Sequence, residues 1–525
     1  MHPLPAAVRA FSRFCHAFAT RRAFAALLAF AGIVSAGTTH AAVQLAPPFA
    51  DHAVLQRDRP VPVWGTAGPG EKITVSFHGV SVHTVTGPDH RWSLLLAPRS
   101  ADNTGADLVV AGENTITLHD VVVGDVWLCS GQSNMGRMVG QSLDSEKETA
   151  GAQFPLIRML SVRGTLADTP ADHVVTTGWK QALPENVGRF SAVGYFFARA
   201  LHQRLGVPIG ILHISFGGTR IEAWMSPTAL ASDPAFAAVQ EEWRKDNVIP
   251  YAERKAKFDA NFAVWQAGET AAKAAGETQR AAFVKTHAKP SAPMTPQQGP
   301  AVLFNGMIAP FVPYGLRGIV WYQGESNVWT PDSYHLLFST LITSWRAHFG
   351  QPELSFYWVQ LADFETGHNW AWVREAQTQT LSLPHTGQAL AIDIGEAGDI
   401  HPRNKQEVAR RLMLIAGAQL YGDTAEFSGP VLASSQRTGD AISVKFNHAA
   451  GGLVVKGSTV NSLEIAGADR VFHPAVARVD GETLIVSSPG IKEPVAVRYA
   501  WCSEPHANLY NAAGLPATPF RTDHW

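Results

Sequence analysis

The chain has 525 residues, of which 46% are hydrophobic and 16% charged, and its formal net charge is −2 at pH 7. This length predicts two to four domains, and a balanced charge without a basic stripe argues against nucleic-acid binding. We therefore expect a globular protein with no nucleic-acid partner.

The first 41 residues are predicted to be a secretory signal peptide. Four arginines between positions 9 and 22 precede an apolar run at 23–36, and small residues follow at 39–41. This pattern is typical of a signal cleaved after Ala41 or Ala42, and the run is short for a membrane-spanning helix. The prediction is a secreted or periplasmic protein with no membrane association after cleavage. A retained membrane anchor is the alternative.

Two cysteines, Cys129 and Cys502, remain after the predicted cleavage. They do not make a disulfide framework, and Cys129 ends an apolar run in which a small buried residue is expected. A bridge between the two is the alternative. No CxxC or clustered His/Cys pattern indicates a structural metal site.

Residues 42–122 are predicted to form a small antiparallel β domain. Short alternating apolar runs stand at 61–64, 73–77, 92–96 and 116–118, and Gly and Pro clusters separate them. Alternation of this kind between turn residues is typical of strands.

From residue 123 to about 424 the pattern becomes that of a parallel α/β sheet. Apolar runs that predict strands alternate with segments of helical period, and strand–helix–strand order predicts parallel pairing. The predicted strands are 121–128, 209–214, 316–322, 355–360 and 389–394, and the predicted helices are 193–205 and 405–420. In an open parallel sheet, the turns after the strands gather at one edge, where ligands bind.

Two further regions differ from this sheet. Residues 233–295 are rich in Ala, Lys, Glu and Gln with a helical period, which predicts a helical insertion that either contacts substrate as a lid or has no role at the site. Residues 425–525 return to short alternating runs, which predict a C-terminal β-rich domain.

The turn after the first predicted strand of the sheet carries the candidate nucleophile. Residues 130–135 read SGQSNM, and a serine on a strand-to-helix turn faces backbone N–H groups that favour a developing negative charge. Ser133 would be the nucleophile, His401 its general base, and Asp399 the acid that orients the imidazole. The alternative is that Ser133 merely caps the following helix.

Acyl transfer also needs donors for the tetrahedral oxyanion. The backbone N–H of Ser133, a backbone N–H of Gly217 or Gly218, and the Gln323 side chain are the candidates. A glycine lets the backbone approach a ligand closely, and a side-chain amide can donate to an anion. Taken singly, a plain turn and a structural hydrogen bond are the alternatives.

Four sequence blocks together resemble the SGNH hydrolases, specifically the sialate O-acetylesterase-like group. They are GDVWLCSGQSNM at 124–135, GGT with EAW at 217–224, WYQGESN at 321–327, and DIHP with NKQ at 399–406. The resemblance implies a three-layer α/β/α parallel-sheet catalytic domain, here flanked by N- and C-terminal β-rich regions. It also implies a serine-dependent carbohydrate O-acetylesterase without metal or cofactor, with an acetylated carbohydrate as its substrate partner.

One departure from that resemblance leaves the acid open. Many SGNH hydrolases place the acid three residues before the histidine, and here that position is Gly398. Asp399, two residues before, could serve. A more distant carboxylate such as Asp393 could serve instead, or Ser133 and His401 could act as a dyad.

Substrate contacts are expected from the side chains beside these turns. The predicted set is Arg220, Glu222, Trp224, Glu325 and Asn327. Arg137, Arg220 and Arg403 could also hold a sialate carboxylate, and Trp224, Trp329, Trp370 and Trp372 could form a sugar platform, with core packing as the default for each tryptophan.

We expect plant hemicellulose, xylan or xyloglucan, as the acetylated substrate. A sialate O-acetylesterase is the first alternative. A non-catalytic carbohydrate-binding protein and a serine hydrolase of another class, such as a lipase, are the others. The absence of a strongly apolar lid sequence argues against a lipid ester.

Overall fold

The computed structural model describes residues 42–364, 370–396 and 398–525. The predicted signal peptide at 1–41 therefore lies outside the described residues. Within the described part, no helix combines the length and the apolar character that crossing a membrane requires. Cys129 and Cys502 are both free thiols, so the alternative of a bridge between them is wrong.

The N-terminal region is built of strands, as predicted, and its last strand continues into the central sheet. Its strands are β1 (Gln44–Leu45), β2 (Val54–Gln56), β3 (Val61–Thr66), β4 (Lys72–Phe77), β5 (Val80–Val85), β6 (Arg91–Leu96), β7 (Asp102–Ala111) and β8 (Thr115–Gly131). The first half of β8 pairs antiparallel with β7, and the second half pairs parallel with strands of the central sheet. The predicted boundary between residues 122 and 123 thus falls inside one strand, and the division into domains stays a prediction.

The central sheet is mostly parallel and carries the site at one edge. Its order is β10-β9-β11-β8-β12-β13-β14, and only β10 within this path pairs antiparallel with its neighbour. The strands are β9 (Phe154–Val162), β10 (Thr176–Ala182), β11 (Ile209–Ser215), β12 (Gly318–Tyr322), β13 (Ser355–Val359) and β14 (Thr386–Ala389). The strand predicted at 389–394 is wrong in position, because β14 ends where it was expected to begin.

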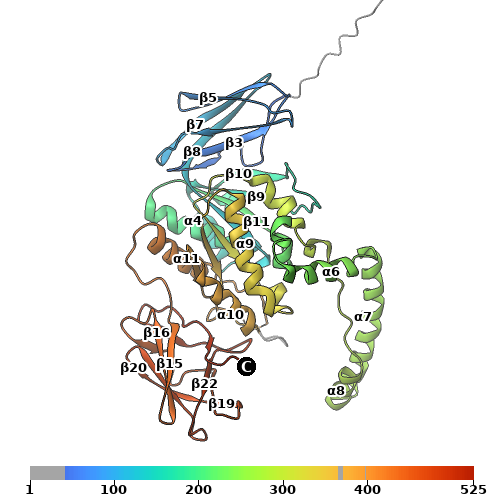
Figure 1. Ribbon diagram of the computed structural model, residues 1–525, viewed down its shortest axis with the longest axis vertical. Coiled ribbons are helices and arrows are strands. Elements are labelled where there is room, and N and C mark those ends of the chain that lie inside the picture. The colour runs from blue at the N-terminus through green and yellow to red at the C-terminus, as the bar shows by residue number, and fades with distance from the viewer. Residues whose placement is uncertain (1–41, 365–369, 397) are drawn as a thin grey trace, which may run out of the picture. The chain divides into compact units, whose positions relative to one another are not determined.

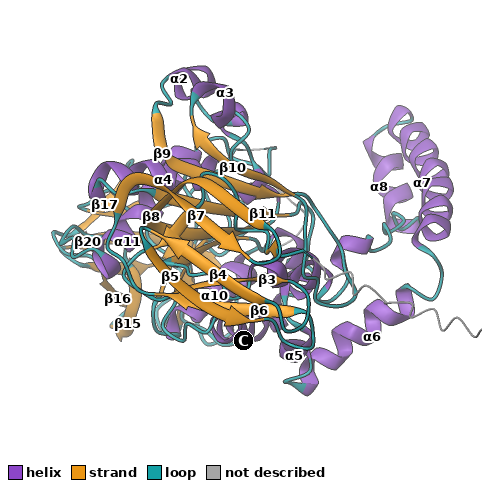
Figure 2. Ribbon diagram, turned by 90° about the horizontal axis from the view of Figure 1, so that it is seen from above, coloured by secondary structure: helices purple, strands orange, loops and turns teal. Residues whose placement is uncertain are grey.

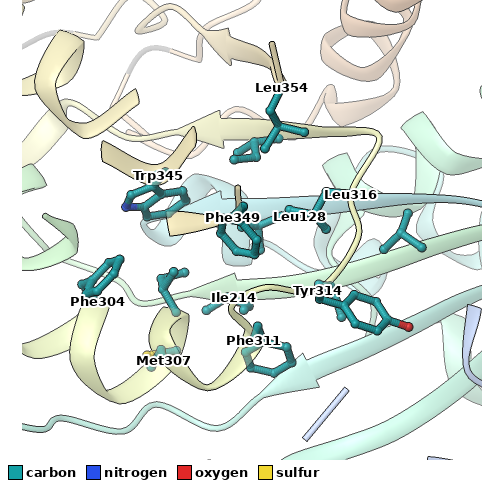
Figure 3. Close-up of a cluster of buried hydrophobic side chains, with 14 of the residues drawn as sticks. Leu128, Ile214, Phe304, Met307, Phe311, Tyr314, Leu316, Trp345, Phe349 and Leu354 are labelled. Atoms are coloured by element: carbon teal, nitrogen blue, oxygen red, sulfur yellow. The ribbon is translucent and has the colours of Figure 1, made fainter. Parts of the chain in front are cut away.

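Alternate residues of the strands point into two separate cores, and helices cover both. On one face, α4 (Ala192–Leu205) and α11 (Lys405–Leu420) pack over Trp127 and Cys129 of β8 and lie side by side (Figure 1). On the other face, α9 (Tyr334–His348) packs over Leu128. Figure 3 shows this second core, in which Trp345 of α9 and Phe349 lie near Leu128 and Ile214 of the sheet. The result is a mixed α/β fold.

The insertion predicted at 233–295 is helical. It contains α6 (Ala237–Asp246), α7 (Tyr251–Ala274) and α8 (Glu277–Thr286), and none of these three helices contains a buried residue. Figure 2 shows α7 and α8 side by side, and aromatic rings of the two helices, such as Trp265 and Phe283, contact one another. These helices thus support each other rather than the central core.

The C-terminal region is β-rich, as predicted. After α10 (Ala371–Gln379) and α11, the chain forms β15 (Val431–Thr438), β16 (Ala441–Asn447), β17 (Leu453–Val455), β18 (Leu463–Ala466), β19 (Phe472–Pro474), β20 (Val476–Asp480), β21 (Thr483–Ser487), β22 (Ala496–Tyr499), β23 (Leu509–Asn511) and β24 (Phe520–Arg521). Its core is shared with Ile392, which comes from the loop after β14.

Candidate active site

The turn after β8 and the loop before α11 meet at one point. Ser133 is the first residue of the four-residue helix α1 (Ser133–Gly136), and His401 precedes α11. The Nε2 atom of His401 lies 2.8 Å from the Ser133 hydroxyl oxygen, although the two residues are 268 positions apart in sequence. This is hydrogen-bond distance between a nucleophile and a general base.

The shape of the serine turn depends on Gly131. Its φ is +134°, and a Cβ at this position would lie 2.2 Å from the carbonyl oxygen of Tyr322 on the neighbouring strand. No other residue fits such a close approach of two backbones. The chain turns sharply here, and Ser133 emerges half-buried at the end of the strand.

Asp399 is the carboxylate that contacts the histidine. One of its oxygens lies 3.4 Å from His401 Nδ1 and also accepts the backbone N–H of His401 at 2.8 Å. That backbone hydrogen bond lowers the pKa of Asp399, which stays ionised at neutral pH. Burial lowers the pKa of His401, and the negative charge of Asp399 partly opposes that shift. His401 is therefore neutral at pH 7 and able to accept a proton.

The alternative acid, Asp393, forms its hydrogen bonds with residues other than His401. Its two oxygens accept hydrogen bonds from Arg411 at 2.6 and 2.9 Å, and Tyr510 donates to one of them at 3.1 Å. The Asp393 and Arg411 side chains are both buried. Asp393 therefore joins α11 to the C-terminal region, and the geometry favours Asp399 as the partner of His401.

The backbone N–H groups predicted as oxyanion donors belong to Ser133 and to the glycine turn after β11. A Cβ placed on Gly217 would stand 3.4 Å from the Ser133 Cβ, so the turn after β11 lies directly against the serine. Gly217 and Gly218 are exposed, and Gly218 has a φ of +67°. Among the described residues, the N–H groups of Ser133, Gly217 and Gly218 have no acceptor, so they can donate to a ligand.

The prediction of Gln323 as a side-chain oxyanion donor is wrong in this geometry. Its amide nitrogen donates to the Thr219 carbonyl at 3.0 Å and to Asn327 Oδ1 at 2.7 Å, which uses both N–H groups. Tyr334 donates to its amide oxygen at 2.9 Å, and the side chain has no exposed surface. Gln323 instead connects its own turn to the glycine turn after β11.

Four of the five predicted substrate contacts are buried, so direct contact with a sugar is wrong for them. Asn327 donates to the Glu222 carboxylate at 3.0 Å, and Trp224 donates to Thr219 at 3.0 Å and packs against Trp321. The Glu325 carboxylate is buried as well. These side chains were adjacent in sequence to the reactive turns, but they point into the core behind them.

Arginines and one tryptophan remain at the surface of this region. Arg220, the fifth predicted contact, lies 3.7 Å from Glu242 of α6. Arg137 lies 3.9 Å from the second oxygen of Asp399. Of the four tryptophans considered for a platform, Trp329 has 64% of its surface exposed. Trp224 and Trp370 are buried, and Trp372 packs against Trp501.

Asn134 and Lys405 both stand in the sequence blocks, but the sequence pattern predicts no role for either. The structure places them directly behind Ser133 and His401, where Lys405 donates to the Asn134 side chain at 2.6 Å. The signal in the sequence is a lysine at the first position of a helix, where the positive end of the helix dipole disfavours a cation. No group of three or more His, Cys, Asp or Glu side chains in the described chain is arranged to hold a metal ion.

Comparisons with known proteins show which family the chain resembles. The family of carbohydrate esterases described as sialic acid-specific acetylesterases matches residues 123–279 and 303–415. A sialate O-acetylesterase of Mus musculus is 30% identical over 526 residues, covering 90% of this chain and 92% of its own. That of Homo sapiens is 31% identical over 412 residues, covering 70% and 69%. A crystal structure of a carbohydrate acetylesterase from Xanthomonas citri has a TM-score of 0.77, is 36% identical, and covers 92% of this chain and 100% of its own.

Proposed function

The chain belongs to the sialic acid-specific acetylesterase family of carbohydrate esterases, and we propose that it removes O-acetyl groups from sialic acids by serine catalysis. Members of this family are carboxylic ester hydrolases. The observation that supports the catalytic part is the 2.8 Å contact between Ser133 Oγ and His401 Nε2. The central sheet with helices on both faces supports the SGNH three-layer arrangement that the sequence blocks imply.

The proposed reaction uses the groups already described. Ser133 Oγ attacks the acetyl carbonyl carbon while its proton passes to His401 Nε2. The resulting oxyanion accepts hydrogen bonds from the N–H groups of Ser133 and Gly217. His401 then returns the proton to the leaving sugar oxygen, and the acetyl group stays on Ser133. A water molecule, deprotonated by His401, attacks the carbonyl carbon of this ester, and His401 returns the proton to Ser133 Oγ as the bond to acetate breaks.

Asp399 stabilises the charged histidine during both steps. The imidazolium that forms when His401 takes the proton lies beside the ionised carboxylate at 3.4 Å. Asp399 stays deprotonated throughout, since its pKa is lowered.

Sialate replaces hemicellulose as the proposed substrate. The curated relatives are named for sialate, and no relative compared is named for xylan or xyloglucan. A sialate carries a carboxylate, which a cation would bind. Arg403 already pairs with Glu396, and Arg220 faces Glu242. Arg137 is the arginine that stands beside Asp399, 3.9 Å from its second oxygen, and its side chain is 23% exposed, so we propose it as the partner of the sialate carboxylate.

The cellular location of the enzyme is also part of the proposal. Export through the N-terminal signal sequence would place it in the periplasm or outside the cell, where acetylated glycans are met. The competing account is a carbohydrate-binding protein without catalysis. That account requires that Ser133 and His401 do not react with the bound carbohydrate.

The test is acetate release by the wild type and by Ser133→Ala. The substrates are O-acetylated sialic acid, acetylated xylan, acetylated xyloglucan oligosaccharides and a small activated acetyl ester. We expect release from the sialate and a loss of at least about a thousandfold in the variant. Ser434→Ala, an exposed serine of β15, is the matched control.

Each outcome is informative. Fastest release from xylan or xyloglucan would reject sialate and keep the esterase. Release from none of the four substrates would reject catalysis and favour the binding account.

A further inference from the structure

Three side chains form a buried polar chain directly behind the Ser133 and His401 pair. The Lys405 ammonium donates to Asn134 Oδ1 at 2.6 Å, and Asn134 Nδ2 donates to Glu325 at 2.5 Å. Lys405 has no exposed surface and Glu325 has 8%. Neither charged group takes part in the proposed reaction steps.

The position of Lys405 is unfavourable for a cation. Burial lowers its pKa to about 7, and it stands at the N-terminus of α11, where the helix dipole repels positive charge. The negative charge of Glu325 and the ring of Tyr322, whose centre is 4.9 Å from the ammonium, partly offset these costs. A surface location would avoid them altogether.

What these two charged groups achieve together is a fixed orientation of the Asn134 amide. Burial raises the pKa of Glu325 as it lowers that of Lys405, and the opposite charge of each group favours the ionised form of the other. The ammonium can only donate, so it selects the amide oxygen, and the carboxylate can only accept, so it selects the amide nitrogen. A flipped amide would place its N–H groups against Lys405 and its oxygen against Glu325. Asn134 is therefore held in one orientation by its neighbours.

The second N–H of this fixed amide reaches the histidine loop. Asn134 Nδ2 also donates to the carbonyl oxygen of Ile400 at 3.0 Å. Asn134 follows Ser133 in the chain, and Ile400 precedes His401. One side chain thus connects the residue after the nucleophile to the residue before the base.

We propose that Asn134, oriented by Lys405 and Glu325, is a positioning unit that holds His401 on the Ser133 hydroxyl. The proposal rests on the proposed function, in which these two residues react. It assigns no contact with substrate to any of the three side chains. Asp399 does not duplicate this role, because it is 43% exposed and lies in the same loop as the histidine.

The double variant Asn134→Asp/Glu325→Gln isolates the connection to Ile400. It keeps the side-chain volumes and the net charge. The glutamine introduced at position 325 can donate to the carboxylate introduced at position 134, and Lys405 still pairs with that carboxylate. The Ile400 carbonyl, however, now faces a carboxylate that cannot donate. We expect kcat on a small activated acetyl ester to fall at least about tenfold, with KM unchanged and the melting temperature within about 3 °C of wild type.

A fluorophosphonate that modifies the catalytic serine separates the possible failures. We expect it to label Ser133 in the wild type, and at least about tenfold more slowly in the double variant. No labelling of the wild type would reject the proposed function. Labelling and kcat at wild-type values in the double variant would reject the positioning unit alone. Glu185→Gln/Asn186→Asp on α3 (Pro184–Val187) makes the same chemical change away from the site and should leave both rates unchanged.

A second variant, Lys405→Met, adds a readout that loss of packing would not change. The positive charges of Lys405 and Arg137 lower the pKa of His401, and Asp399 raises it. Removing Lys405 should therefore raise the pKa of His401, so that the acidic limb of kcat/KM moves to higher pH, while kcat on the plateau also falls. A plateau kcat equal to wild type would overturn the proposal.

Discussion

Two turns leave neighbouring strands of the sheet at the same level and behave in opposite ways. The register pairs Gly131 at the end of β8 with Tyr322 at the end of β12. The turn after β8 presents a half-buried Ser133 whose backbone N–H is free of described acceptors. The turn after β12 buries Gln323 completely, with every polar group of its side chain used. The turn after β8 leaves a backbone donor available to a ligand, whereas the turn after β12 uses its side chain to bind the glycine turn after β11.

The difference shows that proximity to the site does not make a residue reactive. Gln323 carries a good donor for an oxyanion, but both N–H groups bind atoms of the protein. Gly217 and Gly218 in the turn after β11 carry no side chain, and their N–H groups, like that of Ser133, have no acceptor among the described residues. Only those hydrogen-bond donors that have no acceptor within the protein can bind a substrate.

Removal of the general base should have the largest effect on catalysis at the turn after β8. His401→Ala leaves Ser133 without a proton acceptor, and we expect kcat to fall by about a thousandfold or more. Acetate release measures this loss, and unfolding curves should show little change in stability. His473→Ala, an exposed histidine of β19, is the control. A loss below about tenfold would mean that another group serves as the base.

Gln323→Leu breaks the buried turn, and its expected effect is mainly on stability. The buried Thr219 carbonyl loses its donor, whereas Asn327 Oδ1 keeps the backbone N–H of Ile221, so the free energy of unfolding should fall by about 1–3 kcal/mol. Urea unfolding measures it, with the exposed Gln436→Leu as control. A loss of kcat of about a hundredfold at unchanged stability would instead restore Gln323 as an oxyanion donor.

Sequence reasoning succeeded where periodicity and order carry the information. The helix at 405–420 and the serine and histidine turns were placed from apolar patterns and from the order of the blocks. Burial of individual polar side chains was not predictable in the same way. Glu222 and Asn327 are polar and follow reactive turns, but they point inward because the two turns bond to each other, a contact between segments about a hundred residues apart.

The position of the strand after β13 was predicted wrongly for a related reason. Residues 389–394 are more apolar than 386–389, yet the apolar loop packs into the cores while the preceding segment pairs with β13. Hydrophobicity predicts burial, and only the pairing partner decides which buried segment becomes a strand.

Asp399→Asn tests the partly exposed carboxylate beside His401. It should reduce kcat less than removal of the base does. Because Asp399 raises the pKa of His401, its removal lowers that pKa, and the acidic limb of kcat/KM moves to lower pH. We expect kcat to fall about tenfold, since the carboxylate is partly solvated.

Asp393→Asn is the comparison for that variant. It should leave the pH profile in place and reduce stability instead, because the buried Arg411 loses one of its two charged partners and keeps only Glu407. The reverse outcome, a changed profile for Asp393→Asn alone, would assign the acid to Asp393.

Arg137→Gln should have the smallest effect and the most selective one. If Arg137 holds the sialate carboxylate, its loss removes about 1 kcal/mol of binding from a partly exposed ion pair, so KM for O-acetylated sialic acid should rise about fivefold. KM for a neutral activated ester should not change, and neither value should respond to Arg478→Gln on exposed β20. Because the positive charge of Arg137 also lowers the pKa of His401, the acidic limb should move to higher pH, opposite to Asp399→Asn. A shifted limb with unchanged KM for the sialate would leave Arg137 as a partner of Asp399 and place the carboxylate elsewhere.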